Sequence, residues 1–117
     1  MAIISTGPID NSPTAGLGIS QQAAIHLANR SASGSATVLI QGYHLTGSRT
    51  LYVLEQIVLA PNEHAVKRFF SGLAAFEFVL DVSGPGQAGV EAALMGVSAS
   101  GAIVAAVRMA AAEGLRR

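Results

Sequence analysis

"AAFEFVLDV" (residues 74–82) is the stretch of sequence that decides the fold class. Every second residue is apolar, and in a β-strand these residues share one face, which comprises Phe76, Phe78, Leu80 and Val82. In a helix, Glu77 and Asp81 would lie on different sides and would interrupt the apolar stripe. The stretch therefore predicts a strand with an apolar core face and a second, solvated face that carries Glu77 and Asp81.

Turn-forming residues divide the rest of the chain at short intervals. Gly, Pro, Asn and Ser cluster at 33–35, 46–48, 60–63, 71–72, 83–86 and 98–101. The seven segments that we interpret as strands are 23–31, 36–45, 50–60, 64–70, 74–82, 87–98 and 102–109. Short strands between regularly spaced turns are typical of sandwiches and barrels. We expect an all-β fold, an antiparallel, jelly-roll-like β-sandwich of about seven to eight strands with an extended N-terminal arm.

The composition along the chain predicts three parts. Residues 1–19 form a polar, turn-rich ribbon that begins with Ile3 and Ile4, and such a ribbon cannot build a core of its own. We expect it to be an arm or connector that docks on a neighbouring copy of the protein. Residues 20–109 are expected to form the sandwich domain, and residues 110–117 a C-terminal tail.

The strands expected at 36–45 and 50–60 are apolar on both faces. In the first, Val38 and Ile40 mark one face while Leu39 marks the other. A strand of this kind needs cover on both faces, which either a neighbouring subunit or the arm or a loop of the same chain could supply. The residues that we expect at an interface between subunits are Ile3, Ile4, Ile9, Leu17, Leu39, Tyr43, Tyr52 and Leu54.

The overall composition favours self-association over an isolated domain. The chain has 117 residues, of which 12% are charged, and its net charge is zero. Globular domains usually contain about 25% charged residues, and a net charge near zero promotes association. Because the basic residues are scattered, we do not expect nucleic-acid binding. The absence of cysteine excludes disulfides, thiolate metal sites and cysteine nucleophiles.

The sequence contains no pattern that indicates catalysis or metal binding. His26, His44 and His64 are not spaced as paired metal ligands, and the carboxylates follow no catalytic pattern. The glycine-rich stretches lack the helix and the lysine of a phosphate-binding loop. We therefore expect no catalytic residue, no cofactor and no metal site, and we do not expect an enzyme. There is no apolar run of about 20 residues, so no membrane span is expected, and we see no secretion signal.

Several stretches resemble a group of small proteins from endospore-forming bacteria. These are "MAIISTGPIDNSPT" (1–14), the turn "LAPN" (59–62), "AAFEFVLDVSGP" (74–85) and "SASG" (98–101). They are similar to the β-sandwich subunits of endospore appendages and related spore-surface fibres. The resemblance implies a jelly-roll-like sandwich that polymerises through an N-terminal connector. Known appendage subunits carry N-terminal cysteines that cross-link the fibre, whereas this chain would have to polymerise without covalent links.

The expected function is that of a self-assembling structural subunit. We expect a filament or layer outside the cell or on the spore surface, built from copies of this chain, with other spore-surface or cell-surface proteins as further partners. The alternative is a binding module for a carbohydrate or a receptor on the same β-sandwich. Such modules usually present exposed aromatic side chains, and the sequence contains two Tyr and no Trp.

Overall fold

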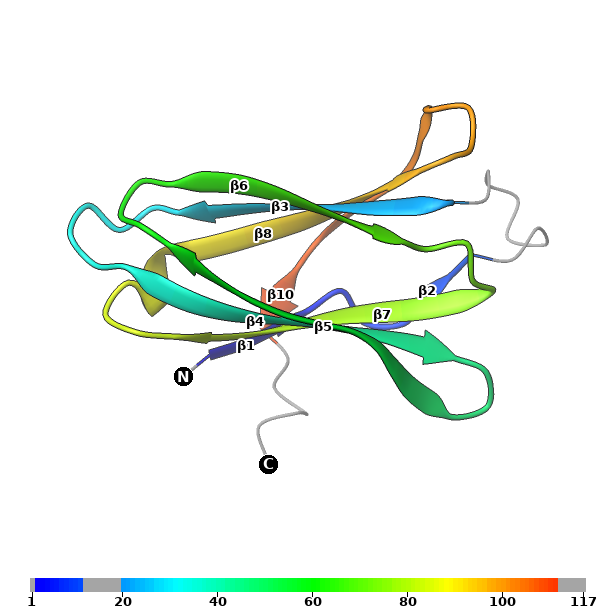
Figure 1. Ribbon diagram of the computed structural model, residues 1–117, viewed down its shortest axis with the longest axis horizontal. Coiled ribbons are helices and arrows are strands. Elements are labelled where there is room, and N and C mark those ends of the chain that lie inside the picture. Colours follow the sequence, from blue (N-terminus) through cyan, green and yellow to red (C-terminus); the bar gives the residue numbers. More distant parts are fainter. Residues whose placement is uncertain (1, 12–19, 112–117) are drawn as a thin grey trace.

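Two antiparallel β-sheets pack face to face in the computed structural model, which describes residues 2–11 and 20–111 (Figure 1). The strands are β1 (Ala2–Ser5), β2 (Ile9–Asp10), β3 (Gln22–Asn29), β4 (Ala36–Leu45), β5 (Arg49–Leu59), β6 (His64–Phe70), β7 (Ala75–Ser83), β8 (Val90–Val97), β9 (Ile103–Arg108) and β10 (Ala110–Ala111). A short 3₁₀ turn, η2 (Gln87–Gly89), precedes β8. The predicted all-β sandwich is confirmed. The described residues contain ten strands instead of seven or eight, because the expected arm and tail also contribute short strands.

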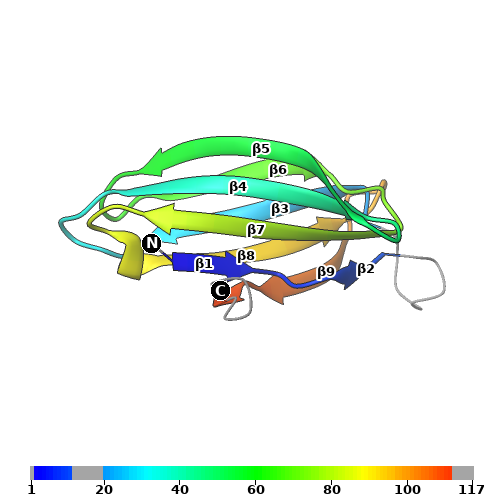
Figure 2. The same cartoon turned by 90° about the horizontal axis from the view of Figure 1, so that it is seen from below.

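The strand order places β5 at one end of the larger sheet. The six-stranded sheet has the order β10-β1-β7-β4-β5, with β2 also paired to β7, and the four-stranded sheet has the order β6-β3-β8-β9. Figure 2 shows β5, β4, β7 and β1 side by side in this order. Most connections cross from one sheet to the other, whereas β4–β5 and β8–β9 are neighbours within one sheet.

The core lies between the two sheets and is centred on β7. The core-facing residues of β7 are at most 1% exposed, and they are the four that the alternation predicts, Phe76, Phe78, Leu80 and Val82. The ring of Phe78 lies 5.6 Å from the ring of Phe69 on β6 and 6.1 Å from that of Tyr52 on β5, measured between centroids. Aromatic packing of this kind links the two sheets.

A β-bulge changes the faces of β5 near its start. The pairing of β4 with β5 shifts by one residue between Gly42 and Tyr43, so that Tyr43 lies opposite Leu51 and Tyr52 is the extra residue. Regular alternation would place Leu51 on one face with Val53, Ile57 and Leu59, and Tyr52 on the other face with Leu54 and Val58. The bulge exchanges the faces of Leu51 and Tyr52. A side chain at Gly42 would collide with the ring of Phe78, 2.8 Å from the position of its Cβ.

The N-terminal segment belongs to the sheet of its own chain. Strand β1 pairs with β7 on one side and with β10 on the other, and β2 pairs with β7. Ile4 and Ile9 pack against the core cluster. The arm expected at residues 1–19 is therefore corrected for residues 2–10, which complete the hydrogen bonds of β7. Leu17 lies outside the described residues, as does the tail beyond residue 111.

Two buried asparagines join loops that the sequence does not bring together. The Asn11 side-chain amide donates to three backbone carbonyl groups, those of Ser20, Ser71 and Leu73. The Asn29 amide donates in the same way to Gly34, Leu59 and Ala60. Because buried backbone carbonyls need partners, these two side chains stabilise the loops at the ends of the sandwich.

Candidate functional site

The face of the six-stranded sheet that points away from the core carries four of the eight residues predicted at an interface. Residues that are paired directly across neighbouring strands share one face of a sheet. The strand registers therefore define this outer face, which includes Ile3 and Ser5 on β1, Thr37, Leu39, Gln41 and Tyr43 on β4, Leu51, Leu54, Gln56 and Val58 on β5, and Glu77, Val79 and Asp81 on β7.

Four of the predicted interface residues lie together on this outer face. They are Ile3, Leu39, Tyr43 and Leu54. Three others, Ile4, Ile9 and Tyr52, pack instead against the core of their own chain. The pairing of β1 and β2 with β7 and the bulge in β5 direct these three side chains toward their own chain.

Tyr52 is held in place at the edge of the core. Its hydroxyl group donates a hydrogen bond of 2.6 Å to the backbone carbonyl of Phe70. Burial raises the pKa of Tyr52 to about 12, because desolvation disfavours the phenolate. The hydroxyl group is thus protonated at neutral pH and acts as a link between β5 and β6.

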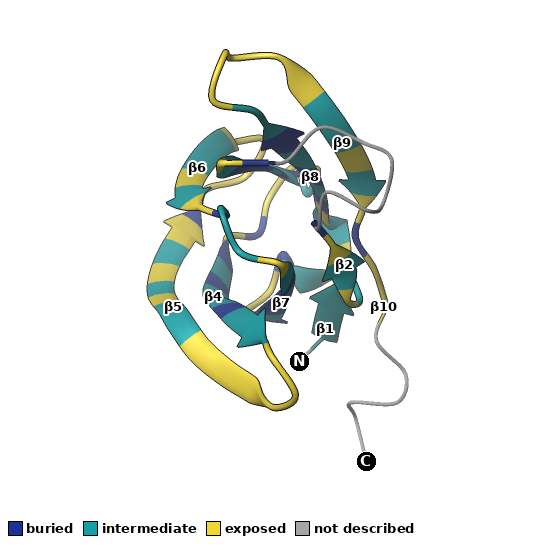
Figure 3. Cartoon of the chain, turned by 90° about the vertical axis from the view of Figure 1, so that its right-hand side faces the viewer, coloured by how far each residue is buried: buried dark blue, intermediate teal, exposed yellow. Residues whose placement is uncertain are grey.

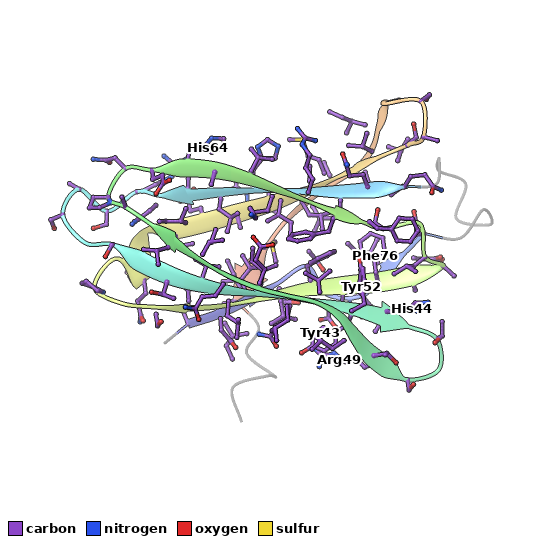
Figure 4. All side chains as sticks on the ribbon, in the orientation of Figure 1. Tyr43, His44, Arg49, Tyr52, His64 and Phe76 are labelled. Carbon is purple, nitrogen blue, oxygen red and sulfur yellow. The ribbon has the colours of Figure 1, made fainter. Side chains whose placement is uncertain are left out.

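Polar side chains in the middle of the outer face form a connected network. Gln41 donates to the Asp81 carboxylate at 2.9 Å and accepts from the Tyr43 hydroxyl group at 2.8 Å. The Arg49 guanidinium lies 3.7 Å from the centroid of the Tyr43 ring, a cation–π contact (Figure 4). These contacts tie β4, β5 and β7 together.

Glu77 belongs to the same network and is buried. Its carboxylate accepts from Arg49 at 3.2 Å and from the Ser5 hydroxyl group at 3.0 Å, and the residue is only 8% exposed. The solvated face predicted for Glu77 is therefore wrong. The residues that contact the Glu77 carboxylate are Ser5 on β1 and Arg49 on β5, and both are distant from Glu77 in the sequence. The sequence around Glu77 therefore does not indicate that this residue is buried.

The outer side of β5 presents large apolar side chains to solvent. Leu51, Leu54 and Val58 are 46%, 63% and 62% exposed, and Figure 3 shows β5 alternating between exposed and partly buried residues. Leu51 and Val58 are not among the residues predicted at an interface. The alternation of the strand places Val58 on the same face as Leu54, whereas the outward position of Leu51 depends on the bulge.

The exposed apolar side chains of β5 are grouped on one strand, unlike the other large apolar side chains that are exposed in the described part of the chain. Phe70 and Ile103 are also more than half exposed, but they lie on β6 and β9, the opposite edges of the four-stranded sheet. On β5, by contrast, the three residues lie on one face of one strand. That strand forms a ladder only with β4 among the described strands, and side chains alone, the Tyr52 hydroxyl group and the ion pair of Glu55 with Lys67, connect its other edge to β6.

The described residues offer few features of other functional classes. No group of three or more His, Cys, Asp or Glu side chains in residues 2–11 and 20–111 could hold a metal ion. The same part of the chain has no helix that is long and apolar enough to cross a membrane. Comparison of the chain with protein-family models, with curated proteins and with solved structures finds no significant match in any of the three.

Proposed function

We propose that this protein is a self-assembling structural subunit whose copies join non-covalently through β5 and the outer face of the six-stranded sheet. The observation that carries the proposal is the row of exposed apolar side chains, Leu51, Leu54 and Val58, on the terminal strand of that sheet. A long, apolar strand at the edge of a sheet is a template for pairing with another chain.

The composition and the family resemblance support the same proposal. The net charge of zero means that identical copies repel one another little. The resemblance to endospore-appendage subunits implies a filament or layer outside the cell or on the spore surface, and it allows other surface proteins as partners. Because the chain contains no cysteine, the contacts between copies are non-covalent.

Burial of Leu51, Leu54 and Val58 does not by itself supply enough free energy for two copies to associate. Burying the exposed part of three such side chains contributes about 3 kcal/mol per copy. Association costs at least about 4 kcal/mol in lost translational and rotational freedom. The main-chain hydrogen bonds of a paired β5 edge and the repetition of the contact along an assembly therefore supply the remainder.

The alternative is a carbohydrate- or receptor-binding module that uses the same face. Its specific support is Tyr43, an aromatic side chain on the outer face of the sheet. The Arg49 guanidinium already covers the Tyr43 ring, however, so this ring is not free to stack on a sugar. For this reason the assembly proposal is the stronger of the two.

The test combines size measurement with electron microscopy on matched variants. The double variant Leu54→Glu with Val58→Glu places charges on β5, whereas the control Ile103→Glu changes an equally exposed residue on β9. Since all three side chains are exposed, each variant should fold normally. We expect the wild type and the control to form assemblies that grow with concentration, and the double variant to remain monomeric. A wild type that stays monomeric and binds glycans would favour the binding module.

A further inference from the structure

The two sides of the sandwich where the sheets end are closed in different ways. On one side the chain itself crosses between the sheets, because β9 pairs with β8 and the following strand β10 pairs with β1. On the other side β5 and β6 end the two sheets, and no backbone–backbone hydrogen bond joins them within residues 2–11 and 20–111. The side chains that connect them are Tyr52, which donates to the Phe70 carbonyl group, and Glu55, which forms an ion pair with Lys67. The main chain of β5 is therefore available to a further strand.

The regular part of β5 lies between two irregular features. The bulge at Tyr52 precedes it, and the turn in which the Glu63 amide donates to the Ala60 carbonyl group follows it. Between them, residues 53–59 pair one by one with residues 36–42 of β4. The Leu59 carbonyl group already accepts from the Asn29 amide. We therefore expect main-chain pairing with a further strand over residues 54–58.

Residues 54–58 are complementary to a second copy of themselves. Two identical antiparallel strands are related by a twofold axis, and directly opposite residues share one face. The register with β4 places Leu54, Gln56 and Val58 on the outer face of the sheet. With the axis at Gln56, Leu54 lies opposite Val58 of the second copy, and Gln56 lies opposite its own counterpart. Two apolar pairs then flank two side-chain amides that can hydrogen-bond to each other.

The neighbouring registers are less favourable. An axis at Glu55 would place two carboxylates directly opposite each other, which destabilises a pair of strands. An axis at Leu54 would extend the pairing into the bulge, and an axis at Ile57 would extend it into the turn. The register centred on Gln56 avoids all three defects.

The other sheet edges among the described strands fit a copy of themselves less well. Strand β6 carries Lys67 and Arg68 near its centre, so an antiparallel pair of β6 strands would bring four cations together. Strand β9 has one large exposed apolar side chain, Ile103, at its start, and β10 has two residues. Strand β5 has 11 residues and the row of exposed apolar side chains, so it is the edge best suited to a second copy.

We propose that β5 pairs antiparallel with β5 of a second copy across a twofold axis at Gln56. This rests on the proposed assembly through β5 and names its partner strand and its register. The larger sheet continues from one copy into the other. Because a twofold contact joins two copies and no more, the dimer is the building unit, and dimers join further through the outer face.

The test uses single-cysteine variants, since the chain has no cysteine of its own. Opposite residues of an antiparallel pair have Cα atoms roughly 4.5–5.5 Å apart, within the range of a disulfide. Gln56→Cys should therefore cross-link to itself under mild oxidation. Leu54→Cys and Val58→Cys should not, because each lies about 13 Å along the strand from its own counterpart. A mixture of these two variants, combined while dilute and then concentrated, should form cross-linked heterodimers.

The matched control is Ala106→Cys, an exposed position within the edge strand β9. Gln56→Cys should cross-link at least about tenfold faster than this control, because pairing raises the effective concentration of its thiols. Assembled protein in which Gln56→Cys does not cross-link, or in which Leu54→Cys cross-links to itself, would overturn this register and leave the assembly proposal standing. Wild-type protein that stays monomeric at every concentration would overturn both.

Discussion

The carboxylate of Glu77 joins three strands of the six-stranded sheet, because it lies on β7 and accepts from Arg49 on β5 and from Ser5 on β1. Glu77→Ala should lower the free energy of unfolding by about 1–3 kcal/mol, since the donors would lose a buried partner. Urea unfolding measures this loss. The control is Glu91→Ala, which breaks an exposed ion pair and should give a change too small to resolve. Equal losses in the two variants would mean that Glu77 is solvated.

Tyr52 should make the stability of the protein depend on pH in the alkaline range. A tyrosine in an unfolded chain has a pKa near 10, whereas burial raises the pKa of Tyr52 to about 12. The folded state therefore holds the proton more tightly between these values. The contribution to stability is complete below about pH 10 and is lost as the pH rises through about 12.

Thermal melts of the wild type and of Tyr52→Phe across this interval provide the measurement. The Tm of the wild type should fall more steeply with pH than the Tm of the variant, because the variant has no phenol at this position. Ionisation of other groups contributes to both proteins alike. Parallel curves would show that Tyr52 is not shielded from water by the core.

At the scale of the strand, β1 offers a comparison of two adjacent isoleucines. Ile4 packs against the core of its own chain, whereas Ile3 lies on the outer face opposite Asp81. Ile4→Thr should cost about 2–3 kcal/mol, because it removes buried apolar contacts and buries a hydroxyl group. Ile3→Thr should change stability by less than about 0.5 kcal/mol. Chemical denaturation of both variants checks this, and equal, small effects would mean that β1 is not part of its own sheet.

The core-facing residues of a strand could be predicted from the sequence where apolar and polar residues alternate regularly. They could be predicted less well where pairing with a distant strand decides which face of the strand points to the core. In β7 the positions of Phe76 and Phe78 follow from the pattern alone. In β5 the faces of Leu51 and Tyr52 depend on the bulge opposite Gly42, which is a property of the pair of strands. Local sequence could not predict that β1 completes the sheet, because the partner strand β7 lies more than 70 residues away.

In the candidate site, too, the sequence predicts residues whose position follows from a local pattern but not residues that are brought together by distant contacts. Leu39 and Leu54 could be identified as residues that need cover because their strands are apolar on both faces in the sequence. The hydrogen-bonded network of Gln41, Tyr43 and Asp81 could not be predicted from the sequence, because it depends on which strands are neighbours in the sheet.

For the whole molecule, the central claim is that copies join through β5. The six-stranded sheet ends in β5 and β10, the four-stranded sheet ends in β6 and β9, and only β5 carries three exposed large apolar side chains among the described strands. An assembly through β5 would extend the larger sheet from one copy to the next. It would leave β9 accessible to solvent.

The most direct test is amide hydrogen exchange, measured by mass spectrometry on dilute protein and on assembled protein. Amides at the open edge of β5 exchange rapidly in a monomer and slowly once another strand pairs with them. We predict that peptides covering residues 53–59 become protected on assembly, while peptides covering 103–108 exchange at the same rate in both samples. Assemblies in which β5 gains no protection, or in which β9 gains it instead, would contradict the claim.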